Sequence, residues 1–387
     1  MTDAAPLRVA TVITRLEGGA GQQAVRGARA MDPAGYQMTI ITGSSDRRLL
    51  DEAAAAGLEV IAEPSLRVPI APASDLLALA RLTALLRHRG FDVVHTHCAK
   101  AGVVGRLAAH RAGVPRLVHT YHGFPFHEFQ GAARRRAYIQ VERRLGRITD
   151  VALCVGTGVA VEAVRRQLVA PERVHTIGVV ADGADQAAAR PPPAVAGRCR
   201  ARAELGLPAD ATVVGAVGRL TYQKAPEDFL AALRALRRPG VTGVWVGDGE
   251  LAGQVAARAA GTPGSRLVLA GQRSNVPDLL PAFDVFALPS RYEGLPTAVV
   301  EAMVCGIPVV ATAVNAVGDV VIPGETGLLV PPGQPALLAE AVAYLLDSPA
   351  AAARMAATAR ARLGTRFGEQ ALRRALIAAY SGGYATA

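Results

Sequence analysis

Short runs rich in valine and isoleucine alternate along the chain with longer segments in which alanine, leucine and arginine recur at helical spacing. In the first half, these runs predict strands at residues 8–14, 37–42, 58–61, 93–96, 117–120 and 151–154. In the second half, they predict strands at residues 213–217, 241–246, 267–270, 285–288, 308–311 and 327–330. Strands that alternate with helices in this way predict an α/β protein with parallel sheets.

The alternation breaks at residues 181–200, where the sequence ADGADQAAARPPPAVAGRCR contains three consecutive prolines and predicts a linker. A chain of 387 residues also exceeds one ordinary core. We therefore expect two Rossmann-like domains, at residues 1–185 and 186–366. A C-terminal helix within residues 367–387 is expected to cross back to the first domain.

The net charge of +10 suits an anionic substrate, nucleic acid or an acidic membrane surface. Aromatic residues make up only 4% of the chain, with one tryptophan, and no nucleic-acid-binding module is recognisable. Little is therefore present to stack on bases, so we expect no nucleic-acid partner.

Cysteine usage and the N-terminal sequence both favour the cytoplasm. The four cysteines lack C-x-x-C spacing, which argues against structural zinc and a disulfide framework; they are Cys98, Cys154, Cys199 and Cys305. The segment MTDAAPLRVATVIT does not have the pattern of a secretion signal, and no apolar run approaches the roughly 18 residues of a membrane span. We expect a cytoplasmic protein, with the inner face of the membrane as an open alternative.

Two glutamates eight residues apart, in SRYEGLPTAVVEAMVCGIPVVAT, carry the most chemical information. Pro296 suits the first turn of a helix, so Glu293 is expected beside unpaired backbone N–H groups that favour an anion. Glu301 follows about two turns later among apolar residues, where a carboxylate needs a hydrogen-bond partner. The pattern predicts that one glutamate reads hydroxyl groups near a bound anion while the other holds a polar group beside it.

This segment, with its E-x7-E spacing and the following GIPVVAT and GETGLLVPP, resembles the donor-sugar-binding segment of retaining glycosyltransferases of family 4. Upstream, VGRLTYQKAPEDFL is similar to the family's phosphate-binding segment, whose arginine and lysine fall at Arg219 and Lys224. The resemblance continues through VGDGE, LAGQRSNVPDLL and the N-terminal half, and so covers nearly the whole chain. It implies the GT-B fold, in which two Rossmann-like domains face each other across a cleft.

The resemblance also implies roles for residues of the second domain. Arg219 and Lys224 are expected to bind the diphosphate and to stabilise the charge that grows on the leaving group. Glu301 is expected to bind the ribose hydroxyls. The hydroxyls of the transferred sugar are expected to contact Glu293 and the backbone of Gly294, Leu295 and Pro296.

In the first half, EGGAGQQAVRGA has two interpretations. Gly19-x-Gly21-x-x-Ala24 formally satisfies the dinucleotide-binding fingerprint of nicotinamide oxidoreductases. However, this loop is expected to begin several residues after the strand ends, and the next strand finishes in Thr42-Gly43, where a ribose-binding acid is required. The resemblance implies instead that the loop brings backbone N–H groups to the donor diphosphate, with Gly19 as the best match.

Five histidines in the first half suggest either a metal site or a substrate contact; they are His95, His97, His119, His122 and His127. Only Glu128 accompanies them at ligand spacing, and His95 and His97 have the pattern of strand-end residues, so we expect no metal. His122 directly precedes Gly123 and matches the family's active-site histidine, which faces the transferred sugar. We expect it to contact the substrate, and its chemical role stays open.

The segment GAARRRAYIQVERRLGRI at residues 131–148 predicts a basic helix. Its apolar face is modest and contains no tryptophan or phenylalanine; it comprises Ala137, Ile139, Val141, Leu145 and Ile148. We favour a solvated helix packed on the N-terminal domain. Peripheral contact with an anionic membrane is the alternative.

These features together predict a retaining glycosyltransferase that moves a hexose or N-acetylhexosamine from a nucleoside-diphosphate sugar, UDP rather than GDP, to an acceptor hydroxyl. The acceptor is either a small soluble aglycone, such as an aminocyclitol, or a lipid-linked saccharide. The sequence offers no obvious carboxylate nucleophile, so we expect the acceptor to attack on the face that the leaving group vacates. No cofactor or metal is expected besides the nucleotide-sugar co-substrate. A GT-B sugar-phosphate phosphorylase, an epimerase and a non-catalytic carbohydrate-binding protein are the alternatives.

Overall fold

The computed structural model describes residues 5–181, 183–186, 195–260 and 266–383. This part of the chain divides into two compact units. The first comprises the described residues up to Val180 and from Glu369 onward, and the second lies within Ala181–Gly368. We expected boundaries after residues 185 and 366, so the division assigns a few residues at each boundary to the second unit instead.

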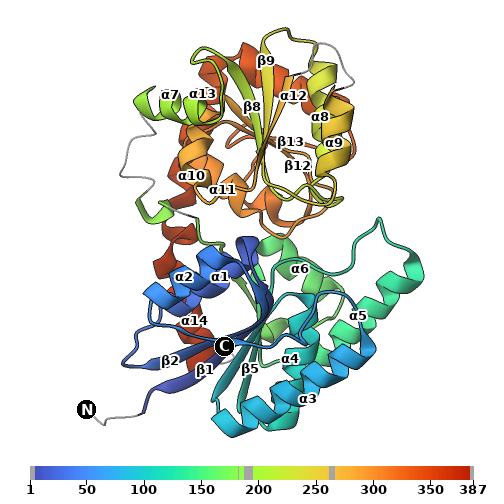
Figure 1. Ribbon diagram of the computed structural model, residues 1–387, viewed down its shortest axis with the longest axis vertical. Coiled ribbons are helices and arrows are strands. Elements are labelled where there is room, and N and C mark those ends of the chain that lie inside the picture. Colours follow the sequence, from blue (N-terminus) through green and yellow to red (C-terminus); the bar gives the residue numbers. More distant parts are fainter. Residues whose placement is uncertain (1–4, 182, 187–194, 261–265, 384–387) are drawn as a thin grey trace. The chain divides into compact units, whose positions relative to one another are not determined.

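The first unit contains a seven-stranded parallel sheet in the order β3-β2-β1-β4-β5-β6-β7 (Figure 1). Its strands are β1 (Leu7–Leu16), β2 (Tyr36–Ser45), β3 (Glu59–Ala62), β4 (Val93–His97), β5 (Arg116–Tyr121), β6 (Val151–Val155) and β7 (Val174–Ile177). All six predicted strands are confirmed, but β7 was missed. Its four residues, VHTI, are mostly only partly buried at the sheet edge, so it lacks the apolar run of an inner strand.

Both β1 and β2 extend beyond their predicted ends. Residues 15–16 continue β1 because they pair with residues 44–45 of β2. Only Glu17 therefore separates β1 from α1 (Gly18–Arg29), and the expectation of a loop that begins several residues after the strand was wrong.

Helices cover both faces of this sheet; they are α1, α2 (Arg47–Ala55), α3 (Pro72–Arg89), α4 (Ala99–Ala112), α5 (Ala132–Gly146), α6 (Thr157–Arg165) and α14 (Glu369–Ser381). The last of these, drawn in red in Figure 1, packs against the blue α1: a Cβ atom added at Gly27 would lie 3.0 Å from Cδ1 of Leu376. The C-terminal helix is therefore part of the core of the first unit.

The basic helix α5 does not have the single apolar face that we expected. Ile139 and Leu145 are buried against the unit, whereas Ala137 and Val141 are exposed. The expectation was wrong because the side that carries Ala137, Val141 and Leu145 at intervals of four residues is buried only at Leu145, whereas Ile139 is buried from another side of the helix.

The second unit contains a six-stranded parallel sheet in the order β10-β9-β8-β11-β12-β13. Its strands confirm all six predictions; they are β8 (Thr212–Val217), β9 (Val241–Val246), β10 (Arg266–Gly271), β11 (Val285–Leu288), β12 (Val309–Thr312) and β13 (Leu328–Val330). Trp245 packs edge-to-face on Phe229, with ring centroids 5.4 Å apart. Gly215 admits the ring of Phe283, because a Cβ atom there would lie 2.1 Å from it.

The helices of this unit are α7 (Val195–Glu204), α8 (Pro226–Leu236), α9 (Ala252–Ala260), α10 (Val276–Leu279), α11 (Thr297–Val304), α12 (Pro335–Asp347) and α13 (Pro349–Leu363). Because α7 begins at Val195, the predicted linker ends earlier than residue 200. The three prolines of that linker lie outside the described residues.

Among the described residues, no single helix is long and apolar enough to cross a membrane. Only α12 and α13 taken together satisfy the length and composition of a span, and they meet at a bend of 100°. Both helices contribute side chains to the core of the second unit, including Leu338, Val342 and Met355.

Candidate functional site

Glu293 is the centre of a polar cluster in the second unit. It lies in the loop between β11 and α11 and is 6% exposed. Its Oε1 accepts hydrogen bonds from Nζ of Lys224 at 2.5 Å and from Oγ of Ser290 at 2.6 Å, and its Oε2 accepts one from Nε2 of Gln223 at 3.3 Å. The carboxylate is therefore held from two sides, and its charge is compensated by Lys224.

Lys224 and Gln223 belong to the loop between β8 and α8, which brings them to the same strand ends as Glu293. Gly218, directly after β8, makes room for the lysine, because a Cβ atom there would lie 3.1 Å from Cε of Lys224. The backbone N–H of Arg291 donates to the carbonyl of Gln223 at 2.8 Å. The two loops are thus fastened together by backbone and side-chain contacts.

Arg219 lies exposed at the start of the same β8–α8 loop, and within the described residues it has no ion-pair partner. Burial raises the pKa of Tyr292, and the positive charge of Arg219 opposes that shift. Arg219 is therefore a solvent-exposed cation in this part of the second unit.

Glu301 lies on α11 and is 8% exposed. Burial, with a further contribution from the charge of Glu301, raises the pKa of Cys305 to about 12, so the cysteine is not a reactive thiolate. Helix α11 begins at Thr297, with Pro296 as its N-cap, one residue later than we expected. Gly294, Leu295 and Pro296 are all buried beside this helix N-terminus.

A third loop fixes the cluster from the end of β12. Oγ1 of Thr312 donates to the carbonyl of Ser290 at 2.6 Å, and Nδ2 of Asn315 donates to the carbonyl of Glu293. Asn315 has φ +41°, in the left-handed region that asparagine tolerates better than most residues. Ser290, Gln223 and these two residues were missed from sequence, although polar residues just beyond strand ends are the signal that could have identified them.

In the first unit, β4 and β5 carry polar side chains on both faces of the sheet. Successive residues point to opposite faces, so His95 and His97 share one face with Thr120, and Thr96 and His119 share the other. The five histidines therefore do not converge on one point. Among the described residues no group of three or more histidine, cysteine or acidic side chains is arranged to hold a metal ion.

On the face towards α1 and α14, the histidines form a chain of contacts. Nδ1 of His95 lies 2.8 Å from Oη of Tyr380, and its Nε2 lies 2.7 Å from Oγ1 of Thr120. Nδ1 of His97 lies 2.9 Å from Nε2 of His122. Burial lowers the pKa of His95 to about 3 and that of His122 to about 4, and it holds the pKa of His97 well below its ordinary value.

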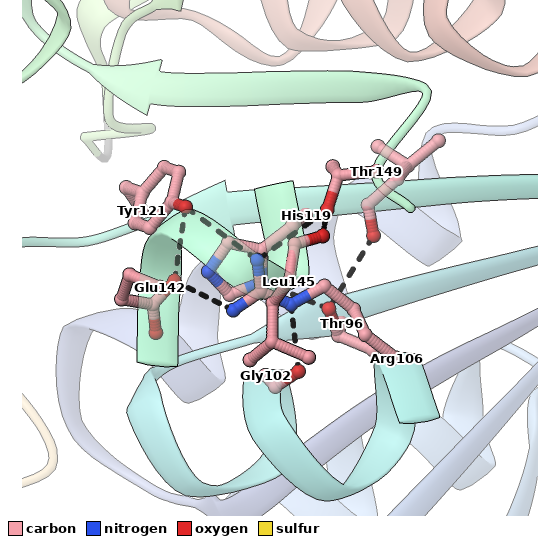
Figure 2. A network of polar contacts seen from close by, with 9 residues as sticks. Thr96, Gly102, Arg106, His119, Tyr121, Glu142, Leu145 and Thr149 are labelled. Carbon is pink, nitrogen blue, oxygen red and sulfur yellow. Dashed lines mark hydrogen bonds and ion pairs between the residues drawn. The ribbon is translucent and has the colours of Figure 1, made fainter. Parts of the chain in front are cut away.

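On the opposite face, a separate network joins α4, α5 and β5 (Figure 2). Arg106 donates to Oε2 of Glu142 at 2.7 Å, Tyr121 donates to the same oxygen at 3.0 Å, and both ends of the ion pair are almost fully buried. His119 lies beside this network and bonds Thr96 through Nδ1 at 2.8 Å. The network is enclosed within the unit, so we interpret it as structural.

Gly19 is exposed in the first turn of α1, where backbone N–H groups have no partner within the helix. Gly21 is explained by packing, because a Cβ atom there would lie 2.8 Å from the carbonyl carbon of Leu16. Gly21 therefore gives no separate support to a dinucleotide-binding loop.

Two family models match the chain. The model described as "Glycosyltransferase Family 4" matches residues 17–179, and "Glycosyl transferases group 1" matches residues 211–348. The Escherichia coli protein named UDP-Gal:alpha-D-GlcNAc-diphosphoundecaprenol alpha-1,3-galactosyltransferase is 33% identical over 65% of this chain and 65% of its own length. D-inositol 3-phosphate glycosyltransferases of Thermobispora bispora and Kineococcus radiotolerans are 32% and 33% identical over 80% and 77% of this chain, and 74% of each relative is covered.

Solved structures share the architecture of the whole chain. Anabaena HepE, crystallised with UDP and glucose, gives a TM-score of 0.80 at 21% identity over 97% of this chain and 100% of its own. Sucrose-phosphate synthase of Thermosynechococcus elongatus gives 0.79 at 23% identity, over 98% of this chain and 100% of its own. With the two parallel sheets, this likeness confirms the GT-B fold.

Proposed function

The chain belongs to the family 4 glycosyltransferases, and from that premise we propose that it transfers a hexose or N-acetylhexosamine from a nucleoside-diphosphate sugar to an acceptor hydroxyl with retention of configuration. The observation that carries the proposal is the ion pair between Lys224 and Glu293 at the strand ends of the second unit. It brings a cation, which can bind phosphate, next to a carboxylate, which can accept hydrogen bonds from sugar hydroxyls.

The hydrogen-bond capacity of this pair supports two separate ligand contacts. An ammonium group has three N–H donors, and Lys224 uses one of them on Glu293. A carboxylate has about four acceptor positions, and three protein donors occupy Glu293. Lys224 can therefore bind a diphosphate oxygen while Glu293 accepts one sugar hydroxyl.

The remaining donor contacts come from Arg219 and Glu301. Arg219 is exposed and unpaired within the described residues, so it is available to the diphosphate, whose charge rises as the glycosidic bond breaks. We assign Glu301 to the ribose hydroxyls, and the backbone of residues 294–296, at the start of α11, to the sugar.

In this proposal the first unit binds the acceptor and also contributes Gly19 and His122. We assign Gly19 to the donor diphosphate through the backbone N–H groups of the first turn of α1. We assign His122 to the substrate. Burial holds its pKa at about 4, so it is a neutral imidazole at physiological pH. It can then donate a hydrogen bond to a hydroxyl or accept one from it.

Relatives support UDP as the nucleotide and leave two acceptor classes. The E. coli relative is named for UDP-Gal and a diphosphoundecaprenol acceptor, whereas other relatives are named for D-inositol 3-phosphate. HepE was crystallised with UDP and with UDP-glucose. We therefore propose a UDP-sugar donor, with a lipid-linked saccharide and a small polyol-like aglycone as the acceptors to be compared.

The bonding of Glu293 supports retention by same-face attack. A carboxylate that already accepts three hydrogen bonds and pairs with Lys224 is a weak nucleophile for a covalent intermediate. The acceptor then enters on the face that the diphosphate leaves, and a diphosphate oxygen takes its proton. Arg219 and Lys224 provide the electrostatic stabilisation that a divalent metal provides elsewhere, so we propose a reaction without metal or cofactor.

Product analysis tests the proposal. Purified protein is incubated with a panel of UDP- and GDP-sugars, with and without each acceptor class, and the products are separated and examined by proton NMR. We expect UDP release that depends on the acceptor, and a small anomeric coupling for a gluco-configured α-linked product. Sugar 1-phosphate or an epimer formed from donor alone would favour a phosphorylase or epimerase, and binding without turnover would favour a carbohydrate-binding protein.

We propose a cytoplasmic location, with contact at the inner membrane face as the second candidate. The outer side of α5 favours the second candidate, since Ala133, Ala137 and Val141 are exposed at i, i+4 and i+8 beside exposed arginines, and its single acid, Glu142, is turned inward to Arg106. Sedimentation with vesicles of phosphatidylcholine, alone or mixed with phosphatidylglycerol, distinguishes these two candidates. Binding only to the anionic vesicles supports membrane contact, and binding to neither supports the cytoplasmic location.

A further inference from the structure

His97 lies between two other histidines on one face of the first sheet. Its Nδ1 is 2.9 Å from Nε2 of His122, and its ring centroid is 4.2 Å from that of His95. The side chain is only 3% exposed. A buried polar ring is destabilising unless its hydrogen bonds are made, so core packing alone does not account for an imidazole at this position.

The bond between His97 and His122 requires that at least one of the two rings be neutral. One nitrogen donates and the other accepts, and only protonation of both rings would place two donors against each other. Burial lowers the pKa of both rings, as the charged form loses solvation. At physiological pH the pair therefore stays bonded, and the ring of His122 keeps one orientation.

The same bond decides which nitrogen of His122 is left for a ligand. Nε2 is occupied by His97, whereas Nδ1 has no hydrogen-bond partner among the described residues. His122 is partly exposed, and Gly123 directly after it has φ +129°, a conformation that a side chain would strain. The backbone and the ring are thus both constrained at this point of the chain.

A second layer holds His97 itself. His95 is bonded at both ring nitrogens, to Tyr380 of α14 and to Thr120 of β5, so its ring cannot rotate freely. His97 packs on that ring and also contacts His122. The other titratable groups that act on these rings are His119, from the opposite face of the sheet, and Tyr380, whose pKa is raised by burial. No acidic side chain contributes to the shifts of His95, His97 or His122.

We propose that His97 is a positioning residue for the transfer reaction: it holds Nε2 of His122, while the bond between Tyr380 and His95 fixes the ring on which His97 rests, so that Nδ1 of His122 meets the substrate in one orientation. The inference rests on the substrate contact that we propose for His122. It extends the functional site from the histidine that touches substrate to the C-terminal helix of the same unit.

A purely structural role for His97 makes the opposite prediction. Leucine fills a similar volume without a polar atom, so a structural position accepts it better than asparagine, which brings an amide into the same buried place. Asparagine, however, places a polar atom near the position of Nδ1 and can restore the bond to His122. If His97 is a positioning residue, His97→Leu should therefore be the more stable of the two variants and His97→Asn the one with the higher turnover.

The experiment compares His97→Leu, His97→Asn and Tyr380→Phe by steady-state kinetics and thermal unfolding. His119→Leu is the control, since it removes a buried histidine from the opposite face of the same sheet. For His97→Leu we expect kcat to fall by about 10- to 100-fold, the scale of a misplacement of about 1 Å, with donor KM little changed. His97→Asn should regain most of the loss, Tyr380→Phe should lose a few-fold, and folded His119→Leu should keep its turnover.

Two results would overturn the inference: full turnover in His97→Leu, or an equal loss in His97→Asn. The variant His122→Ala separates this failure from that of the proposed function. Loss of turnover in His122→Ala with full turnover in His97→Leu refutes only the positioning role. Full turnover in His122→Ala refutes the substrate contact and the positioning role together, while transfer of sugar by the unaltered protein still stands or falls by product analysis.

Discussion

Nζ of Lys224 lies 2.5 Å from Oε1 of Glu293, and this contact joins the loop after β8 to the loop after β11. Arg291, in the loop after β11, adds a second link through its ion pair with Glu227 in the first turn of α8 at 3.0 Å. Together the two ion pairs hold a cation and a carboxylate in one arrangement, which is the kind of preorganisation that stabilises developing charge efficiently.

Replacement of Lys224 by alanine should lower kcat by about 100-fold, because charge on the leaving diphosphate grows in the transition state. It should also lower the free energy of unfolding, because Glu293 loses the cation that compensates its buried charge. Kinetics and chemical denaturation measure the two effects. The double variant Lys224→Ala/Glu293→Gln is the control: it should regain stability without regaining turnover, and a rise in donor KM alone would make Lys224 a ground-state contact instead.

Replacement of Glu301 by glutamine should weaken binding of UDP by about 1 to 3 kcal/mol, because an amide is a weaker acceptor for ribose hydroxyls than a carboxylate. Calorimetric titration of the folded variant measures this. An affinity equal to that of the unaltered protein would rule out the ribose contact.

At Asn315, glycine and alanine should separate backbone strain from the side-chain bond. Both substitutions remove the hydrogen bond to the carbonyl of Glu293, but only alanine adds strain at φ +41°, of about 1 kcal/mol. We expect donor KM to rise in both variants. We expect Asn315→Ala to unfold at a lower denaturant concentration than Asn315→Gly. Donor KM unchanged in both would show that this bond does not support the donor site.

Stability should fall as the pH falls from about 6.5 towards 4. In the unfolded chain, histidines protonate near pH 6.5, whereas burial holds the pKa of His95 at about 3 and those of His97 and His119 well below their ordinary value. The unfolded state then binds more protons than the folded state. This lowers the free energy of unfolding by up to about 1.4 kcal/mol per pH unit for each histidine. Denaturation at several pH values checks this, and His119→Leu should show a shallower slope by about that amount.

Activity should survive EDTA, because Arg219 and Lys224 are expected to neutralise the diphosphate without a metal. Initial rates with and without the chelator measure this. Loss of activity that manganese or magnesium restores would contradict it.

The sequence was sufficient to predict the strands that are apolar along their whole length, since such runs are typical of strands buried on both faces of a parallel sheet. It did not predict the strand residues whose conformation depends on pairing with a neighbouring strand. Residues 15–16 are strand only because they pair with residues 44–45, and β7 is strand only because it pairs with β6. Predictions from local pattern do not contain these partners.

In the candidate site, too, local sequence identified single residues but not the long-range contacts between them. Lys224 and Glu293 could each be identified from their own loops, but their contact spans 69 positions, and Ser290 and Gln223 become significant only once that contact is known. Strand alternation places His95 and His97 on one face. Tyr380, the partner of His95, follows it by 285 positions, and no local signal connects the two residues.

Because α14 belongs to the first unit, that unit is completed only after the second unit has been synthesised. A nascent chain can assemble the second unit as soon as its residues emerge from the ribosome, whereas α1 must wait for Leu376 and His95 must wait for Tyr380. Until then, the α1 side of the first sheet lacks part of its cover, and His95 lacks one of its two hydrogen-bond partners. The histidine chain can therefore close only after α14 has been synthesised, so premature termination before Glu369 would leave a second unit of full length and a first unit without α14.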